Sequence, residues 1–338
     1  MKISRQTREI INTVLVLLLI VLLVVVYLVY PLGRVKTMHG RVNIDDYGED
    51  TVVVNDPTPW LEAGLLPDTF SVEADGLTTL AALYLTPGDT IPVQPGGTDT
   101  TAADSLTDSV VVAPLRAGPD PVAGLAILVH HEYENRDSLI DLATRFLDRG
   151  YAVVAYDQRA SGHSTGKYHG EGQYEASDLQ EIVAWLVFRE KVVEPTLAVG
   201  WGLGADAAIL AAREDQRIDE VVAIRPYLTT ERWQTLTRRE HDTWWFPLYQ
   251  TITWFWYNIR SSYAAAYREV EDIETVACPT LLLVEKESID DDAVVRLQEV
   301  SEGDLLTVET VPDAREAVYD RILEFAPVGD TAAIAVGK

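Results

Sequence analysis

Two glycine-rich stretches contain the residues whose spacing could support nucleophilic catalysis. The first, GHSTG at residues 162–166, fits the pattern G-x-S-x-G, which can present a serine as a nucleophile. That chemistry needs a sharp turn between a strand and a helix, so that the hydroxyl projects above a sheet. The residues after GHSTG (KYHGEGQYEAS) lack apolar periodicity until about Leu179. We therefore expect Ser164 to be a loop residue rather than a nucleophile.

The second stretch, GWGLG at residues 200–204, has the required setting but no serine. It follows the apolar strand candidate PTLAV and leads directly into an alanine-rich helix. Gly202 occupies the position at which a serine would stand. Glycine tolerates the strained backbone of such a turn, but it has no side chain with which to attack.

Both stretches belong to an alternation of buried strands and amphipathic helices that begins at Leu125. The strand candidates span residues 126–129, 152–156, 197–199, 221–224, 280–284 and 305–309. Near-continuous apolar strands separated by helices indicate a parallel sheet covered on both faces. Upstream, residues 70–73 and 79–85 predict an antiparallel hairpin with a turn at residues 74–76. The sequence therefore predicts an α/β fold.

With these elements in place, residues 68–326 resemble the α/β-hydrolase superfamily, in particular its serine peptidase-like and esterase-like branches. The hairpin TFSVEADGLTTLAALYLTP resembles the family's entry hairpin, and residues 127–166 resemble the next strand, oxyanion loop, first helix and following strand. The matched residues are His130, Asn135, Arg136, Gly150, Tyr151, Asp157, Arg159, Gly162 and Ser164. The resemblance implies an α/β-hydrolase-like, mostly parallel sheet flanked by helices, with a loop inserted at 88–122 and a helical cap at 226–274.

The resemblance also implies where a catalytic triad would lie, and the sequence departs from it. Gly202 stands at the nucleophile position, and Glu287, or alternatively Asp290, is the best-placed acid after the strand TLLLV. The position of the histidine is taken by Arg315, which cannot act as a general base at neutral pH.

The oxyanion loop departs from the family pattern as well. His131 and Glu132 stand where the family has glycine, and a carboxylate at that place opposes a developing oxyanion. Because nucleophile, base and oxyanion loop have all changed, we expect serine hydrolysis by the usual route to be absent.

An apolar segment near the start of the chain predicts a membrane anchor. Residues 10–30 are 21 residues without a charge, and as a helix they would span about 31 Å. We expect a short tail at 1–9, an uncleaved single-pass anchor at 10–30 in the lipid bilayer, a stalk at 31–67 and a tail at 327–338. Basic residues flank both ends of the segment, and we favour a cytoplasmic amino terminus with an extracytoplasmic domain.

The expected cap is rich in aromatic residues, which suggests a contact surface. Its large aromatic side chains are Trp233, Trp244, Trp245, Phe246, Tyr249, Trp254, Phe255, Trp256 and Tyr257. Such a set either packs on the domain core or meets the membrane interface or an integral membrane protein partner. A formal charge of −26 argues against a nucleic-acid partner.

These observations lead to an expectation about function. We expect a membrane-anchored, catalytically inactive α/β-hydrolase-like protein that serves as a scaffold or accessory subunit of a membrane complex. The alternatives are a hydrolase that uses Ser164 with His163 or His130, and a lyase-like reaction that needs no serine. The histidines at 130, 131, 163 and 169 match no strong metal motif, so we expect neither a metal nor a cofactor.

Overall fold

The structure is a computed structural model of the 338-residue chain. It describes residues 11–20, 22–23, 55–76, 78–90, 122–166, 169, 172–229, 278–301 and 305–326. The chain divides into two compact units, one of residues 1–40 and 234–267 and the other of residues 41–233 and 268–338.

In the first unit, residues 11–20 and 22–23 are helical, and their apolar side chains are exposed. Within the described residues, no helix is both long enough and apolar enough to cross a bilayer. Several expected segments lie outside the described residues: the two tails, the rest of the anchor, most of the inserted loop, and most of the cap, including the nine aromatic residues named above. Expectations about the membrane partner and orientation remain predictions.

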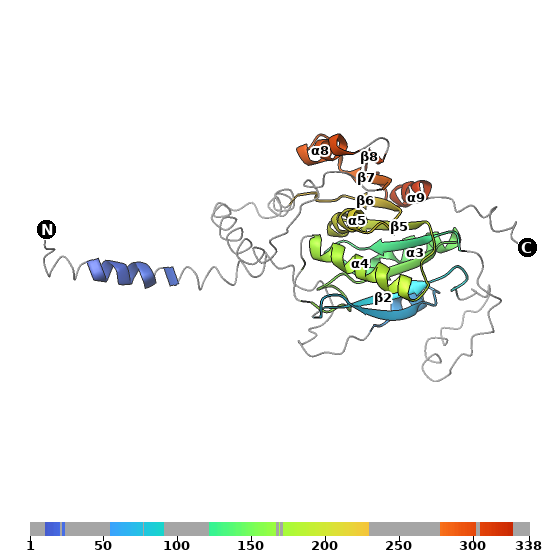
Figure 1. The fold of residues 1–338 in the computed structure, drawn as a ribbon, viewed down its shortest axis with the longest axis horizontal. Helices are drawn as coiled ribbons and strands as arrows, with labels where there is room; N and C mark the ends of the chain where they lie inside the picture. Colours follow the sequence, from blue (N-terminus) through green and yellow to red (C-terminus); the bar gives the residue numbers. More distant parts are fainter. Residues whose placement is uncertain are drawn as a thin grey trace, which may run out of the picture. The chain divides into compact units, whose positions relative to one another are not determined.

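The second unit is built on an eight-stranded sheet in the order β1-β2-β4-β3-β5-β6-β7-β8 (Figure 1). The strands are β1 (Asp68–Glu73), β2 (Thr79–Leu85), β3 (Leu125–Val129), β4 (Ala152–Tyr156), β5 (Thr196–Trp201), β6 (Glu220–Ile224), β7 (Thr280–Val284) and β8 (Leu306–Thr310). The β1–β2 and β2–β4 pairs are antiparallel, and every other pair is parallel. The expected entry hairpin and mostly parallel sheet are confirmed.

Helices cover both faces of the sheet and create two hydrophobic cores. They are α2 (Thr58–Glu62), α3 (Ile140–Asp148), α4 (Gln173–Phe188), α5 (Leu203–Glu214), α8 (Asp292–Val300) and α9 (Arg315–Phe325), with short 3-10 turns η2 (Arg136–Leu139) and η4 (Lys286–Ser288). Ile127 and Val154 face the core under α4, α5 and α8, whereas their neighbours Leu128 and Ala155 face the core under α2, α3 and α9. Because successive side chains point to opposite faces, a strand buried on both sides must be apolar throughout.

The domain begins earlier in the sequence than expected. Trp60, assigned to the stalk, is fully buried, and its indole N–H donates to Oδ1 of Asp137 at 2.8 Å. Asn55 donates to the carbonyls of Phe70 and Ala82 at 2.8 and 3.0 Å. The expected boundary at residue 68 is therefore corrected to Asn55 or before, because Trp60 of α2 and Leu65 are buried in the core and the indole bonds to Asp137 of η2.

Candidate functional site

The turn at residues 200–204, which we call the elbow, joins β5 directly to α5. Gly202 caps the helix with φ 53° and ψ −119°, a region that residues with a side chain rarely adopt. A β-carbon built on Gly202 would lie 2.5 Å from Cδ2 and 2.8 Å from Nε2 of His131. The imidazole of His131 thus occupies the space into which a nucleophilic side chain would project.

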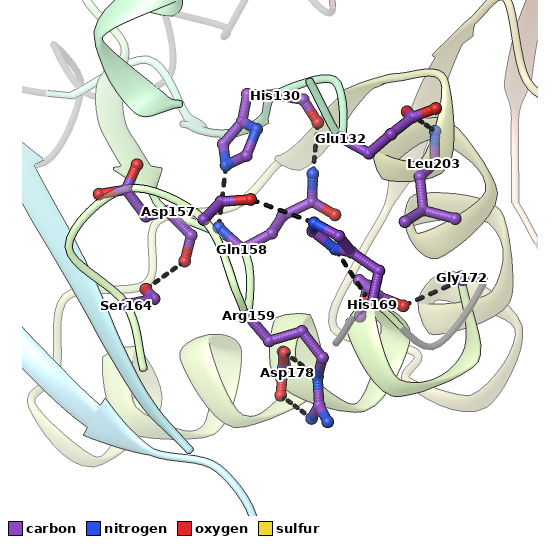
Figure 2. Close-up of polar contacts among 12 residues, drawn as sticks. His130, Glu132, Asp157, Gln158, Arg159, Ser164, His169, Gly172, Asp178 and Leu203 are labelled. Atoms are coloured by element: carbon purple, nitrogen blue, oxygen red, sulfur yellow. Dashed lines mark hydrogen bonds and ion pairs between the residues drawn. The ribbon is translucent and has the colours of Figure 1, made fainter. Parts of the chain in front are cut away.

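Glu132 lies directly behind this imidazole and is fully buried. Its Oε2 accepts a hydrogen bond from the backbone N–H of Leu203 at 3.2 Å (Figure 2) and lies 3.3 Å from Nδ1 of His131. The amide after the nucleophile position usually serves the oxyanion. Here a carboxylate of the protein occupies it, so an oxyanion at that amide would meet both steric exclusion and charge repulsion.

Tyr227 fixes the second oxygen of the same carboxylate. Its hydroxyl donates to Oε1 of Glu132, and burial, together with the charge of Glu132, raises the Tyr227 pKa well above its ordinary value. The tyrosine therefore stays protonated and remains a donor. The backbone of residues 227 and 228 is held in turn by Asp206 of α5, which accepts both N–H groups at 3.2 and 3.0 Å.

A pocket of about 300 Å³ opens beside the elbow at the carboxyl ends of the strands. This edge is where ligands bind in open α/β sheets. The polar side chains that line it are His131, Glu134, Arg225, Asp313 and Arg315, and the apolar lining includes Trp201, Val311 and Tyr319. The His131 side chain is 30% exposed, so its ring is both held by a buried carboxylate and open to a ligand.

The loop of residues 157–166, which contains GHSTG, is a tightly bonded support rather than an elbow. The hydroxyl of Ser164 donates to the carbonyl of Asp157 at 2.5 Å (Figure 2) and accepts from the N–H of Ala81 at 2.9 Å. A β-carbon on Gly162 would lie 2.3 Å from the Asp157 carboxylate, so only glycine fits beneath it. Ser164 is 1% exposed, and its hydroxyl both donates to and accepts from the backbone.

His130 and His163 do not pair with Ser164. His130 is fully buried, and its Nε2 accepts from the N–H of Gln158 at 2.9 Å, which leaves Nδ1 to donate to the carbonyl of His131 at 2.6 Å. Burial lowers the pKa of His130, so the neutral tautomer with the proton on Nδ1 is favoured. The backbone N–H of His163 donates to the Asp157 carboxylate at 2.9 Å. Within the part of the chain that the structure describes, no three metal-ligating side chains gather.

A second hydrogen-bonded chain of catalytic residue types lies behind this loop. The hydroxyl of Ser161 is 3.2 Å from Nε2 of His169, and Nδ1 of His169 is 3.3 Å from Oε1 of Glu175 on α4. Glu175 is held by the N–H of Gly172, which its Oε2 accepts at 3.0 Å. The connectivity is that of a serine, histidine and acid triad. Ser161 and Glu175 are fully buried, however, and His169 is nearly so.

The remaining expected site residues have different placements. Arg315 is the first residue of α9 and lines the pocket, as the family's histidine position would. Glu287 lies in η4 with an exposed side chain and does not line the pocket, and Asp290 is also exposed.

Sequence reasoning missed Ser161, Glu175 and Tyr227. Ser161 and Glu175 lie in segments without a motif, and only three-dimensional proximity joins them to His169. The Glu132–Tyr227 contact joins residues 95 positions apart. The available signal in the sequence was the pair His131 and Glu132 in the expected oxyanion loop. We interpreted this pair only as the loss of the family's oxyanion loop.

Comparisons with known proteins agree with this geometry. Residues 109–227, about a third of the chain, match the sequence profile of the X-Pro dipeptidyl-peptidase (S15) family. The esterase Pf2001 of Pyrococcus furiosus is similar in structure with a TM-score of 0.56 and 18% identity, over 85% of this chain and 97% of that one. An α/β hydrolase of Vibrio vulnificus has a TM-score of 0.50 and 15% identity, over 92% of each chain. No curated protein matches. The chain has the fold of the α/β hydrolases.

These comparisons contradict the expected catalytically inactive scaffold or accessory subunit. The matching profile is that of a peptidase family, and the similar structures are an esterase and a hydrolase. The expectation that the protein is not an enzyme is therefore wrong. It treated the loss of a serine and a histidine at two positions as the loss of hydrolysis, although attack by water requires neither residue at those positions.

Proposed function

We propose that this protein is a hydrolase that activates water with His131, in a site rearranged around the elbow. The observation that carries the proposal is the placement of His131. Its ring stands over Gly202, borders the pocket and is backed by the buried carboxylate of Glu132. A base within reach of the substrate and an acid that orients the base are the two requirements for general-base hydrolysis.

The chemistry requires the tautomer of His131 with the proton on Nδ1, which the Glu132 carboxylate favours at 3.3 Å and the backbone N–H of Tyr133, also 3.3 Å from Nδ1, opposes. With the proton of Nδ1 directed to the carboxylate, Nε2 keeps its lone pair on the side of Gly202 and can take a proton from water. The resulting hydroxide attacks the carbonyl carbon of an ester or amide, and the imidazolium returns its proton to the leaving group. Arg225 and Arg315 line the pocket and give it positively charged groups, while Glu132 occupies the amide that would otherwise serve the oxyanion.

Turnover of 4-nitrophenyl acetate and butyrate by the full-length chain tests this mechanism. We expect His131→Asn to lower kcat by about 100-fold or more, because proton transfer by a positioned base contributes 10²–10⁴-fold. His163→Asn is the matched control, since this histidine lies in the loop of residues 157–166 and does not line the pocket. Full activity in His131→Asn, or no hydrolysis by the wild type, would exclude the mechanism.

A second candidate is serine hydrolysis through Ser161, His169 and Glu175. The two hydrogen bonds of this chain favour it, whereas the complete burial of Ser161 places it second. In this mechanism the Ser161 hydroxyl attacks the acyl carbon and its proton passes to Nε2 of His169, which then gives it to the departing alcohol or amine. Water hydrolyses the resulting acyl-enzyme to release the acid and restore the serine. A fluorophosphonate probe separates the candidates, because it labels an activated serine and not a water-activating histidine. Labelling that is lost in Ser161→Ala and kept in Ser164→Ala would establish the second candidate.

We also propose that residues 10–30 attach the chain to a lipid bilayer. The support is their uncharged apolar sequence and the helical conformation of residues 11–20 and 22–23. Flotation of the full-length chain with phosphatidylglycerol vesicles should succeed, and it should fail after Leu17, Leu18 and Leu19 are changed together to glutamate. If the variant floats as well as the wild type, another part of the chain holds the lipid.

A further inference from the structure

The two arginines that line the pocket, Arg225 and Arg315, differ in their partners. Nε of Arg225 lies 2.5 Å from the carboxylate of Glu285, so its charge is neutralised locally. Arg315 instead donates to neutral oxygens, from Nε to the hydroxyl of Tyr319 at 2.5 Å and from Nη2 to the carbonyl of Ser138 at 2.8 Å. Among the described residues, Arg315 has no ion pair with a carboxylate.

The hydrogen bonds of Arg315 also fix its orientation. Its guanidinium carbon lies 5.4 Å from the centre of the Tyr319 ring, so the cation rests over an aromatic face one turn along α9. Contacts from α9 on one side and η2 on the other restrain the guanidinium at the pocket. A restrained guanidinium loses little side-chain entropy when a ligand binds, and its planar fork suits a carboxylate.

We propose that the pocket binds the carboxylate of its ligand through Arg315, so that the substrates are esters or amides that carry a second, free carboxylate. This inference rests on the proposed hydrolase function. Apolar side chains next to Arg315, among them Trp201, Val311 and Val318, provide a surface for the carbon chain that links the two groups. The carboxylates of Glu134 and Asp313 also line the pocket, and they would repel a ligand that carries several negative charges. A single carboxylate on an apolar chain is therefore the chemistry that fits.

Binding of two ligands that cannot be hydrolysed tests the inference separately from catalysis. Equilibrium dialysis of the full-length chain would compare 4-phenylbutyrate with 4-phenylbutanol, which has the same apolar chain without the charge. We expect the carboxylate to bind about tenfold or more tightly than the alcohol, because a charge-assisted hydrogen bond contributes on that scale. Equal affinities would overturn the proposal.

Substitutions test whether Arg315 causes the preference for 4-phenylbutyrate over 4-phenylbutanol. Arg315→Gln should reduce the affinity for 4-phenylbutyrate to that for the alcohol, whereas Arg315→Lys should retain part of the preference. Arg321→Gln is the matched control, since Arg321 lies on the same helix and is paired with Glu309 outside the pocket. An unchanged preference in a folded Arg315→Gln variant would assign the carboxylate to another site. Hydrolysis could fail while this preference persists, so the proposed function and the ligand class are tested independently.

Discussion

Replacement of Gly202 by alanine tests how closely the elbow and His131 depend on each other. The φ of 53° at this position costs a residue with a side chain about 1–3 kcal/mol. The new methyl group would also lie 2.5 Å from the His131 ring, and moving that ring off its rotamer costs about 0.5–1.5 kcal/mol more. We expect Gly202→Ala to lower the free energy of unfolding by about 2–4 kcal/mol in total.

A double-mutant cycle separates the two contributions. In a His131→Ala background the clash with the ring disappears, while the backbone strain and the 2.8 Å approach to Oε2 of Glu132 remain, so Gly202→Ala should cost about 1 kcal/mol less than in the wild type. Urea unfolding of the full-length chain, followed by circular dichroism, measures all four proteins. Gly64→Ala is the control, because Gly64 also has a positive φ, 81°, and a β-carbon there would meet no atom within 4 Å.

Additive effects of Gly202→Ala and His131→Ala on the free energy of unfolding would refute this reasoning. If Gly202→Ala has the same effect in both backgrounds within about 0.5 kcal/mol, the ring of His131 does not occupy the nucleophile space. Water activation by His131 requires the ring at that position, so the proposed mechanism would then have no structural basis. Gly64→Ala should show no coupling to His131→Ala.

Three further predictions concern residues away from the elbow. Ser164→Ala should cost about 2–4 kcal/mol in urea unfolding, since a buried carbonyl and a buried N–H both lose their partner, and hydrolysis should persist in the folded protein. Trp60→Ala should cost about 3–5 kcal/mol in the same assay, and a cost below about 1 kcal/mol would mean that residues 55–67 do not dock. Burial, with the nearby charge of Asp219, raises the pKa of Glu220 to about 7 from 4.5, so its contribution to stability is fully present below pH 4.5 and is lost as the pH rises through 7. Glu220→Gln should remove this loss, raising the melting temperature relative to wild type at pH 8 but not at pH 4.5.

The arrangement of the sheet could be predicted from the sequence because its strands are buried on both faces. Runs such as Ala152–Tyr156 and Thr280–Val284 are apolar throughout, and the spacing of helices between them leaves a parallel sheet as the economical solution. The elbow was also identifiable, since PTLAVGWGLG leads from a strand to a helix within one turn. At these strands and at the elbow, the structure has the elements that the local sequence pattern predicts.

The chemistry of the site could not be predicted in the same way, because contacts distant in sequence create it. Glu132 reaches the N–H of Leu203 across 71 residues, and no spacing rule anticipates that contact. Trp60 was assigned to a stalk because its neighbours are polar, although one buried indole is enough to dock the segment. Inactivity was inferred from the family's own positions, and such an inference cannot detect the base that we propose in the oxyanion loop.

The contacts of Asn55 also determine how the domain would respond to mechanical tension. Asn55 joins the edge strand β1 and its neighbour β2 through two carbonyls, and its side-chain oxygen accepts a hydrogen bond from Arg136 of η2. The backbone N–H of Arg136 in turn holds the carboxylate of Asp157 at 2.9 Å. A force on the chain before residue 55 would therefore load these bonds first and shear them together. If the protein is tethered at its amino end, tension enters the domain next to the loop that supports the site, and the far edge at β8 bears none of it directly.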